Sequence, residues 1–247
     1  MEFGLLGPFE ATHRRARIDV RGRTDRKILS MLLLSVGHAV SVGALEDALW
    51  PESAPATARR QVRNRVAALR RTLARAGEDP IESVDDGYRI PHGAVYCDVT
   101  RFADRHRDAV HQARNGDEPA AIRMMDNALR LWRGPALMGL TGRFFDSAAT
   151  RLEETRLAAI EARNEWRLRL DQFDELVPEL AEHVAAQPYR ARMLAQFMWA
   201  LHCSGRTPQA LAEYGSYRRR LADDLGITPG RGLRDTYLRI LRDDIAG

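Results

Sequence analysis

Short apolar and polar alternations at the start of the chain are followed by longer amphipathic runs. The alternations predict strands over Phe3–Ala11, with a bend or bulge at Gly7-Pro8, and over Arg17–Val20. Apolar residues at helical spacing then predict helices over about Asp25–Val36 and Val42–Trp50, and Ser41 can cap the second of these.

A third helix follows the loop at Pro51–Pro55, with Thr57 in position to cap it and Gly77 to end it after Arg75. Ile81–Pro91 then predicts a hairpin around the turn Asp85-Asp86-Gly87. Strands, three helices and a terminal hairpin are the order of a winged helix-turn-helix, in which the third helix is the recognition helix. Residues 1–93 are therefore predicted to form an α+β winged-helix DNA-binding domain.

From Asp98 onward the pattern is helical only, which predicts an all-α second domain over residues 94–247. The expected helices lie near 99–115, 117–132, 147–171, 173–187, 190–204, 207–224 and 230–244. Leu176 and Leu180 recur 34 residues later as Ala210 and Tyr214, which is the tetratricopeptide period. Short turns between consecutive helices favour antiparallel pairs.

The third helix carries an unusual charge pattern. Between Ala56 and Arg75 there are seven arginines and no acidic residue. The apolar residues Val62, Val66, Leu69 and Leu73 form one core stripe, so Arg60, Asn64 and Arg71 point the opposite way. A helix face with only positive charges forms no ion pairs along the helix. DNA can supply the negative charge, and its major groove admits one helix. A solvated basic face is the alternative. Arg89 in the hairpin is either a DNA contact or an ordinary surface residue.

Composition excludes several classes of function. Lys27 is the only lysine among 38 basic residues, and no glycine-rich loop precedes it, so a phosphate-binding P-loop is excluded. G-x-S-x-G, H-E-x-x-H and C-x-x-C are absent, so neither an enzyme nor a metal site is expected, and no cofactor. Two cysteines, no signal-peptide pattern and no apolar run of membrane length predict a cytoplasmic, nucleoid-associated protein.

Ordered motifs along nearly the whole chain resemble the Streptomyces antibiotic regulatory protein family, in which an OmpR-type winged helix precedes a bacterial transcriptional activation domain. In the first domain these motifs are Phe3-Gly-Leu-Leu-Gly-Pro-Phe, Ala48-Leu-Trp-Pro51, Leu69-Arg-Arg-x-Leu73 and Gly87-Tyr-Arg-Ile90. In the second they are Cys97-Asp-Val-x-x-Phe102, Leu131-Trp-Arg-Gly-Pro-Ala-Leu137, Arg156-Leu-x-Ala-x-Glu161, Gly205-Arg-x-Pro-x-Ala-Leu-x-x-Tyr214 and Leu225-Gly-Ile-x-Pro-Gly-x-x-Leu-Arg234.

The resemblance implies that two copies bind side by side on direct repeats in promoters of secondary-metabolite (antibiotic) biosynthesis genes. It also implies recruitment of RNA polymerase, with the sigma factor as the expected contact. By position, the implied DNA contacts are Thr57, Arg60, Arg63, Asn64, Arg70 and Arg71. The chain departs from the family at Ala67-Ala68, where a polar residue and an arginine are usual, and at Arg63 and Arg65, where glutamine and tyrosine are usual. The preferred bases can therefore differ from the usual repeat.

Several alternatives stay open. Phe144-Phe145 can pack against the long helix or face a partner, and Arg218-Arg219-Arg220 can be a solvated face or contact an acidic surface. The chain ends at Gly247 without nucleotide-binding or sensor domains, so no ATP switch is expected. The rival function is a helical-repeat adaptor for protein partners, with a winged helix that does not bind DNA.

Overall fold

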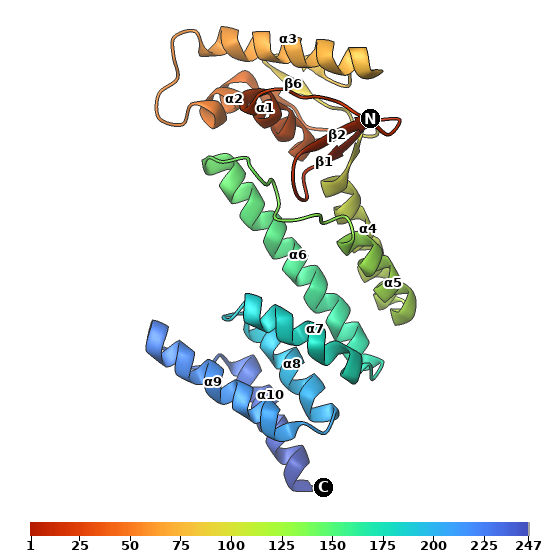
Figure 1. Cartoon of the computed structure of the whole chain (residues 1–247), viewed down its shortest axis with the longest axis vertical. Coiled ribbons are helices and arrows are strands. Elements are labelled where there is room, and N and C mark those ends of the chain that lie inside the picture. Colours follow the sequence, from red (N-terminus) through yellow and green to blue (C-terminus); the bar gives the residue numbers. More distant parts are fainter. Residues whose placement is uncertain (247) are drawn as a thin grey trace. The chain divides into compact units, whose positions relative to one another are not determined.

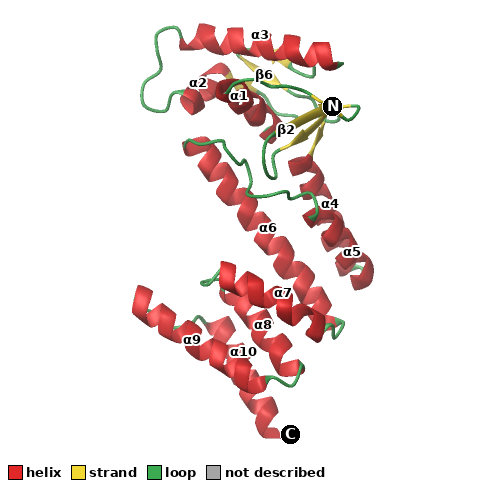
Figure 2. Ribbon diagram, viewed as in Figure 1, coloured by secondary structure: helices red, strands yellow, loops and turns green. Residues whose placement is uncertain are grey.

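The structure, a computed structural model, describes residues 1–246, so that only Gly247 at the end of the predicted second domain lies outside the described residues. The chain forms two compact units. One contains Met1–Arg107 and Asp126–Leu157, and the other contains Asp108–Met125 and the chain from Ala158 onward. Helices are red and strands yellow in Figure 2.

The first unit begins with two small sheets that flank three helices (Figure 1). One sheet has the strand order β3-β2-β1-β7, formed by Ala16–Arg17, Glu10–His13, Glu2–Gly4 and Tyr96–Cys97. The other has the order β4-β6-β5, formed by Val40–Ser41, Gly87–Arg89 and Glu82–Val84. The helices are α1 (Arg23–Leu34), α2 (Val42–Leu49) and α3 (Ala58–Ala76). The predicted winged helix-turn-helix is confirmed.

The first predicted strand is wrong in one respect. Instead of a single bent strand over Phe3–Ala11, the chain reverses direction, and β1 pairs antiparallel with β2. Gly7, at φ 145° in the middle of this segment, allows the reversal. The predicted strand over Arg17–Val20 is also shorter, because only Ala16–Arg17 pairs with β2.

The two predicted helix caps have different outcomes. The Ser41 hydroxyl accepts a hydrogen bond from the backbone N–H of Ala44 at 3.1 Å, which confirms the cap of α2. The predicted cap at Thr57 is wrong, because its side chain accepts no hydrogen bond from the α3 backbone. Its backbone lies at φ −95°, ψ 5° rather than in the extended region that capping needs, and its Oγ1 accepts from Gln61 Nε2 instead.

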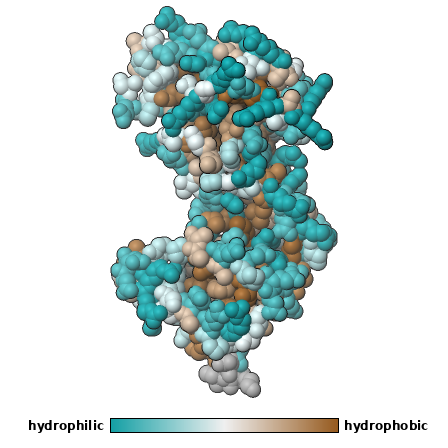
Figure 3. Space-filling view, in the orientation of Figure 1, coloured by the Kyte–Doolittle hydropathy of each residue, from teal (hydrophilic) through white to brown (hydrophobic). Residues whose placement is uncertain are grey.

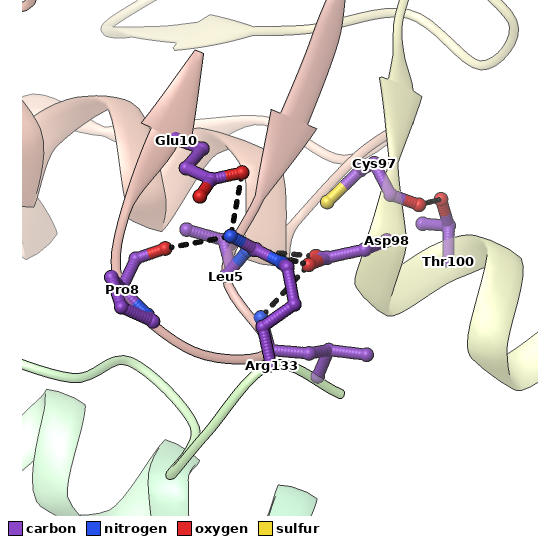
Figure 4. Close-up of polar contacts among 8 residues, drawn as sticks. Leu5, Pro8, Glu10, Cys97, Asp98, Thr100 and Arg133 are labelled. Carbon is purple, nitrogen blue, oxygen red and sulfur yellow. Dashed lines mark hydrogen bonds and ion pairs between the residues drawn. The ribbon is translucent and has the colours of Figure 1, made fainter. Parts of the chain in front are cut away.

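A largely buried carboxylate joins the first strand to the start of α4 (Asp98–Arg114) (Figure 4). Asp98 accepts the backbone N–H of Leu5 at 2.8 Å and of Leu6 at 3.0 Å, and its side chain is only 11% exposed. Arg133 Nη2 donates to the same carboxylate at 3.0 Å, and Nη1 lies 2.6 Å from Glu10. The backbone N–H of Arg133 also donates to the carbonyl of Leu6 at 2.7 Å. The β1–β2 turn is therefore held by a single ion-paired cluster.

The segment after Arg133 follows this turn closely. Leu137 N–H donates to the Leu5 carbonyl and Met138 N–H to the Gly7 carbonyl. At the start of α6 (Arg143–Arg169), Phe145 is fully buried whereas Phe144 is 37% exposed. Phe145 is therefore a core residue, whereas Phe144 lies partly at the surface. The Lys27 ammonium lies 5.5 Å from the centre of the Phe145 ring, and burial lowers the pKa of Lys27.

The remaining helices of the chain follow the predicted pattern. They are α5 (Glu118–Leu129), α7 (Phe173–Ala186), α8 (Ala191–Cys203), α9 (Thr207–Leu225) and α10 (Arg231–Ala246). Consecutive helices α7, α8 and α9 pack against each other, and α10 also packs against α8. Leu176, Leu180, Ala210 and Tyr214, the four residues of the 34-residue repeat, are all buried. The predicted helical second half is confirmed.

A partly buried ionic network ties the second half of α6 to α7 and to the segment before α8. The Glu161 carboxylate is 5% exposed and accepts from Arg190 Nε at 2.6 Å. Glu179 accepts from Arg163 and from Arg167, each at 2.8 Å. None of the helices in the described part of the chain is long and apolar enough to cross a membrane.

Removing the Asp98 carboxylate is expected to destabilise the protein. Asp98→Ala leaves two buried N–H groups and one guanidinium without their acceptor, so we expect a loss of about 3 kcal/mol in the free energy of unfolding. Asp98→Asn keeps one acceptor oxygen and should cost about half as much. Urea denaturation followed by circular dichroism measures both values, and equal stability of all three proteins would contradict the role given to the carboxylate.

Gly87 holds the hairpin against β4 through a close backbone approach. A Cβ atom at this position would lie 2.3 Å from the carbonyl oxygen of Val40, so Gly87→Ala should cost about 3 kcal/mol by overpacking. Gly43 in α2 is the matched control, because its nearest neighbour would be 3.9 Å away. Gly43→Ala should stabilise the protein by about 0.5–1 kcal/mol through helix propensity. Thermal unfolding compares the two variants.

Candidate nucleic-acid interface

The helix α3 is seated by one apolar stripe. Val62, Val66, Leu69 and Leu73 are each no more than 1% exposed, and the helix packs on α1 and α2. The stripe repeats at three- and four-residue intervals, so the remaining residues occupy the flanks and the outward face. Figure 3 shows mostly hydrophilic residues over the surface that α3 forms.

Three of the seven arginines on α3 are tied to acids of neighbouring elements. Arg59 pairs with Asp86 in the β5–β6 turn, Arg65 lies 3.6 Å from Asp25 of α1, and Arg70 Nε lies 2.6 Å from Asp79 beyond the helix. Arg70 also donates to Ser83 of β5 at 3.4 Å. Arg59 and Arg70 thus link the helix to the hairpin and the segment before it, and Arg65 links it to α1.

The ion pairs are reflected in the acidity of the carboxyl groups. The hydrogen bond from Arg59 holds the pKa of Asp86 below its usual range, and the nearby charge of Arg63 acts in the same direction. Burial raises the pKa of Asp25, while Arg65 partly opposes this shift. The hairpin turn thus carries an ionised carboxylate that is neutralised by the helix.

Polar side chains cover the outward face of α3 and its edge beside the hairpin, where the charge of Arg63 acts on Asp86. Arg60, Arg63, Asn64 and Arg71 are exposed, and among the described residues they make no side-chain hydrogen bond or ion pair. Arg75, one turn beyond Arg71, has the same environment. Arg75 is not among the DNA contacts predicted from the sequence, although no acidic residue lies between Ala56 and Gly77 to pair with it along the helix. Guanidinium and amide groups of this kind can pair with guanine and adenine edges.

The structure separates the predicted contact residues into two groups. Arg60, Asn64 and Arg71 lie on the outward side of α3, and Thr57 is exposed at its start. Arg63 is exposed at the edge of the helix, near Asp86. Arg70 is held by Asp79, and Arg89 is held by Glu82 at 2.6 Å. Exposed pairs of this kind contribute little to stability, so both arginines can exchange their carboxylate for a phosphate.

No group of three or more histidine, cysteine or acidic side chains suited to a metal ion occurs among the described residues. His202 and Cys203, the adjacent pair in the sequence, belong to the end of α8. The His202 ring is tilted against the Trp199 ring at a centroid distance of 5.5 Å, and its Nδ1 lies 2.9 Å from the hydroxyl of Thr207. His202 therefore packs at the end of α8, whereas Cys203 is exposed.

Comparison with known proteins identifies both halves of the chain. The family described as "Transcriptional regulatory protein, C terminal" matches residues 20–90, and the family described as "Bacterial transcriptional activator domain" matches residues 97–241. DnrI of Streptomyces peucetius is 34% identical over 99% of this chain and 93% of its own length. The chain belongs to the Streptomyces antibiotic regulatory protein family. The predicted resemblance is confirmed.

Other members of this family and its relatives are longer. AfsR of Streptomyces coelicolor is 36% identical over 100% of this chain but only 25% of its own length. The regulator EmbR of Mycobacterium tuberculosis is 35% identical over 98% of the chain, which spans 63% of EmbR. A solved structure of EmbR with a low-affinity phosphopeptide has a TM-score of 0.93 and covers 98% of this chain and 65% of its own. The family and these relatives are transcriptional regulators, not enzymes.

The Arg59–Asp86 pair generates a titration prediction. Arg59→Gln removes the hydrogen bond, so the pKa of Asp86 should rise toward its ordinary value. Because the folded pKa is lowered, the pair stabilises the fold above the ordinary pKa of an aspartate, and this stabilisation is lost as the pH falls below it. Carboxyl carbon NMR titration measures the shift. Arg63→Gln, which removes only a nearby charge, should move the pKa less, and an equal effect of both variants would contradict the assignment.

Proposed function

We propose that the protein is a sequence-specific transcription activator that reads direct repeats in promoter DNA with α3. The single observation that carries the proposal is the outward face of α3, where Arg60, Arg63, Asn64 and Arg71 are exposed and unpaired while three other arginines of the helix are bound to acids. The three arginines in this set form no ion pair within the described residues, whereas a major groove accepts one helix and offers paired acceptors to arginine.

The roles of the individual residues follow from their positions. Arg60, Arg63, Asn64 and Arg71 face the base edges, and Thr57 and Arg70 contact phosphates at the margins of the groove. Arg89 in the hairpin contacts a phosphate after release from Glu82. The relatives named as regulators support this use of the winged helix.

The helical part of the chain recruits RNA polymerase, and the sigma factor is the expected contact. Two copies lie side by side on two repeats, and the protein works on the nucleoid, at promoters of biosynthetic genes. The match of residues 97–241 to an activator domain family supports this role.

Fluorescence anisotropy with the intact chain tests the proposal. Duplexes from promoters near its own gene are compared with a shuffled duplex of equal composition at two salt concentrations. We expect a preference of roughly a thousandfold for the correct promoter, with affinity falling steeply as salt rises. Binding to neither duplex would leave the winged helix without a DNA role and favour the protein-interaction adaptor.

Single substitutions then locate the reading face. Arg60→Ala should reduce the preference for the promoter about 5- to 100-fold, because a bidentate base contact contributes about 1–3 kcal/mol of discrimination. Arg21→Ala is the matched control, since Arg21 is exposed but paired with Asp19 at 2.6 Å. The control should keep the promoter preference. An unchanged preference in Arg60→Ala would remove this residue from the proposed set of base contacts.

A further inference from the structure

The turn between β2 and β3 carries a second group of unpaired arginines. Arg14, Arg15 and Arg17 are exposed, and among the described residues none of them makes an ion pair or side-chain hydrogen bond. The nearest acidic residues along the chain are already paired, because Glu10 lies 2.6 Å from Arg133 and Asp19 lies 2.6 Å from Arg21. Arg14 and Arg15 therefore project from a short hairpin without an ionic partner among the described residues, whereas the charge of Arg17 acts on Asp19.

The backbone of this turn is unfavourable for arginine. His13 pairs with Ala16 across β2 and β3, so Arg14 and Arg15 are the two central residues of a tight turn. Both have left-handed backbone angles, with φ 48° and φ 69°. Turns of this kind strongly prefer Asn-Gly, because side chains with a bulky Cβ substituent are strained there. Two arginines at these positions cost conformational energy and make no contact that would offset it.

The turn adjoins the proposed reading helix. A Cβ atom on Gly77, the residue that ends α3, would lie 2.6 Å from Nε2 of His13, so the imidazole packs directly against the end of the helix. In Figure 1, β2 and the C-terminal end of α3 lie at the same side of the domain. The unpaired Arg71 and Arg75 occupy the last turns of α3, so the free positive charge continues from the helix to the hairpin turn.

We propose that the β2–β3 turn is a second contact with the DNA backbone, in which Arg14 and Arg15 bind phosphates flanking the bases read by α3. This inference rests on the proposed function of α3. Phosphates are the expected ligand because a guanidinium binds them bidentately, and because the turn lies beyond the end of the reading helix, beside Gly77. The tight turn fixes the backbone of Arg14 and Arg15, so less conformational entropy of the backbone is lost when the two side chains bind the duplex.

The test uses Arg14→Asn combined with Arg15→Gly in the full chain. Asn-Gly suits the turn, so the variant should unfold at the same or a higher temperature than the original protein. Each phosphate contact contributes a slope of about −0.9 in a plot of log affinity against log salt. Loss of two contacts should therefore make the slope shallower by about 2 and weaken binding about 30-fold at roughly 0.15 M salt. The preference for the promoter over the shuffled duplex should not change, because phosphate contacts carry no sequence information.

Two controls distinguish a phosphate contact from an effect of net charge and from a contact between neighbouring copies. Arg107→Ala with Arg114→Ala removes the same charge from exposed positions of α4 and should leave the salt slope unchanged. An equal loss in that variant would show an effect of net charge and overturn the proposal. A duplex with one repeat is compared with a duplex of two. A defect seen only with two repeats would indicate a contact with a neighbouring copy and would also overturn it.

The same titrations distinguish failure of this inference from failure of the proposed function. If the original protein prefers its promoter but the Asn-Gly variant binds with the same affinity and salt slope, the turn has no role and the reading helix keeps its own. If the original protein shows no promoter preference, the proposed function itself fails. In that case a salt-slope change in the variant would describe only nonspecific binding, and the proposal would be overturned as a flanking contact.

Discussion

The carboxylate of Asp98 is the interaction on which the arrangement of the first unit depends. It begins α4, yet its acceptors are used by the backbone of the β1–β2 turn and by Arg133 from the segment after α5. Leu5 and Leu6 lie 92 or more residues before Asp98, and Arg133 lies 35 residues after it. The two carboxylate oxygens of Asp98 therefore join three distant stretches of the chain. A charged side chain that is only 11% exposed needs donors for its oxygens, and here each oxygen has one or more.

This cluster also explains why the first unit does not end where the winged-helix pattern ends. The unit includes Asp126–Leu157, whose backbone binds the turn through Arg133, Leu137 and Met138. The loop that follows α5 is therefore part of the support for the N-terminal sheet. The backbone of this loop is hydrogen-bonded to the β1–β2 turn of the winged helix. The same loop contains the Leu131-Trp-Arg-Gly-Pro motif of the sequence.

On α3, the distribution of acids decides what each arginine does. The arginines at the flanks of the helix pair with acids from three different segments, which are Asp25, Asp79 and Asp86. The arginines on the outward side are left without partners. One set of charges on the helix is thus paired within the domain while a second set forms no ion pair, although the sequence shows a single uniform run of basic residues.

Periodicity located the three helices of the first domain and the seven that follow it to within a few residues, because most of them have a clear apolar stripe and a glycine, proline or polar residue at their ends. The outward position of Arg60, Asn64 and Arg71 followed from the same stripe. The sequence could not reveal that Arg70 is bound by Asp79 or Arg89 by Glu82, since those pairs depend on how the hairpin returns to the helix. It also missed the reversal near Gly7, which depends on long-range hydrogen bonds to Asp98 and Arg133, and the Thr57 backbone, whose side chain accepts from Gln61 instead of capping α3. The use of arginine at every basic position except Lys27 has a chemical consequence. A guanidinium stays charged throughout the physiological pH range and is not a substrate for lysine acetylation, while Lys27 lies against the Phe145 ring. The positive charge of the arginines is therefore constant over the physiological pH range and cannot be removed by acetylation.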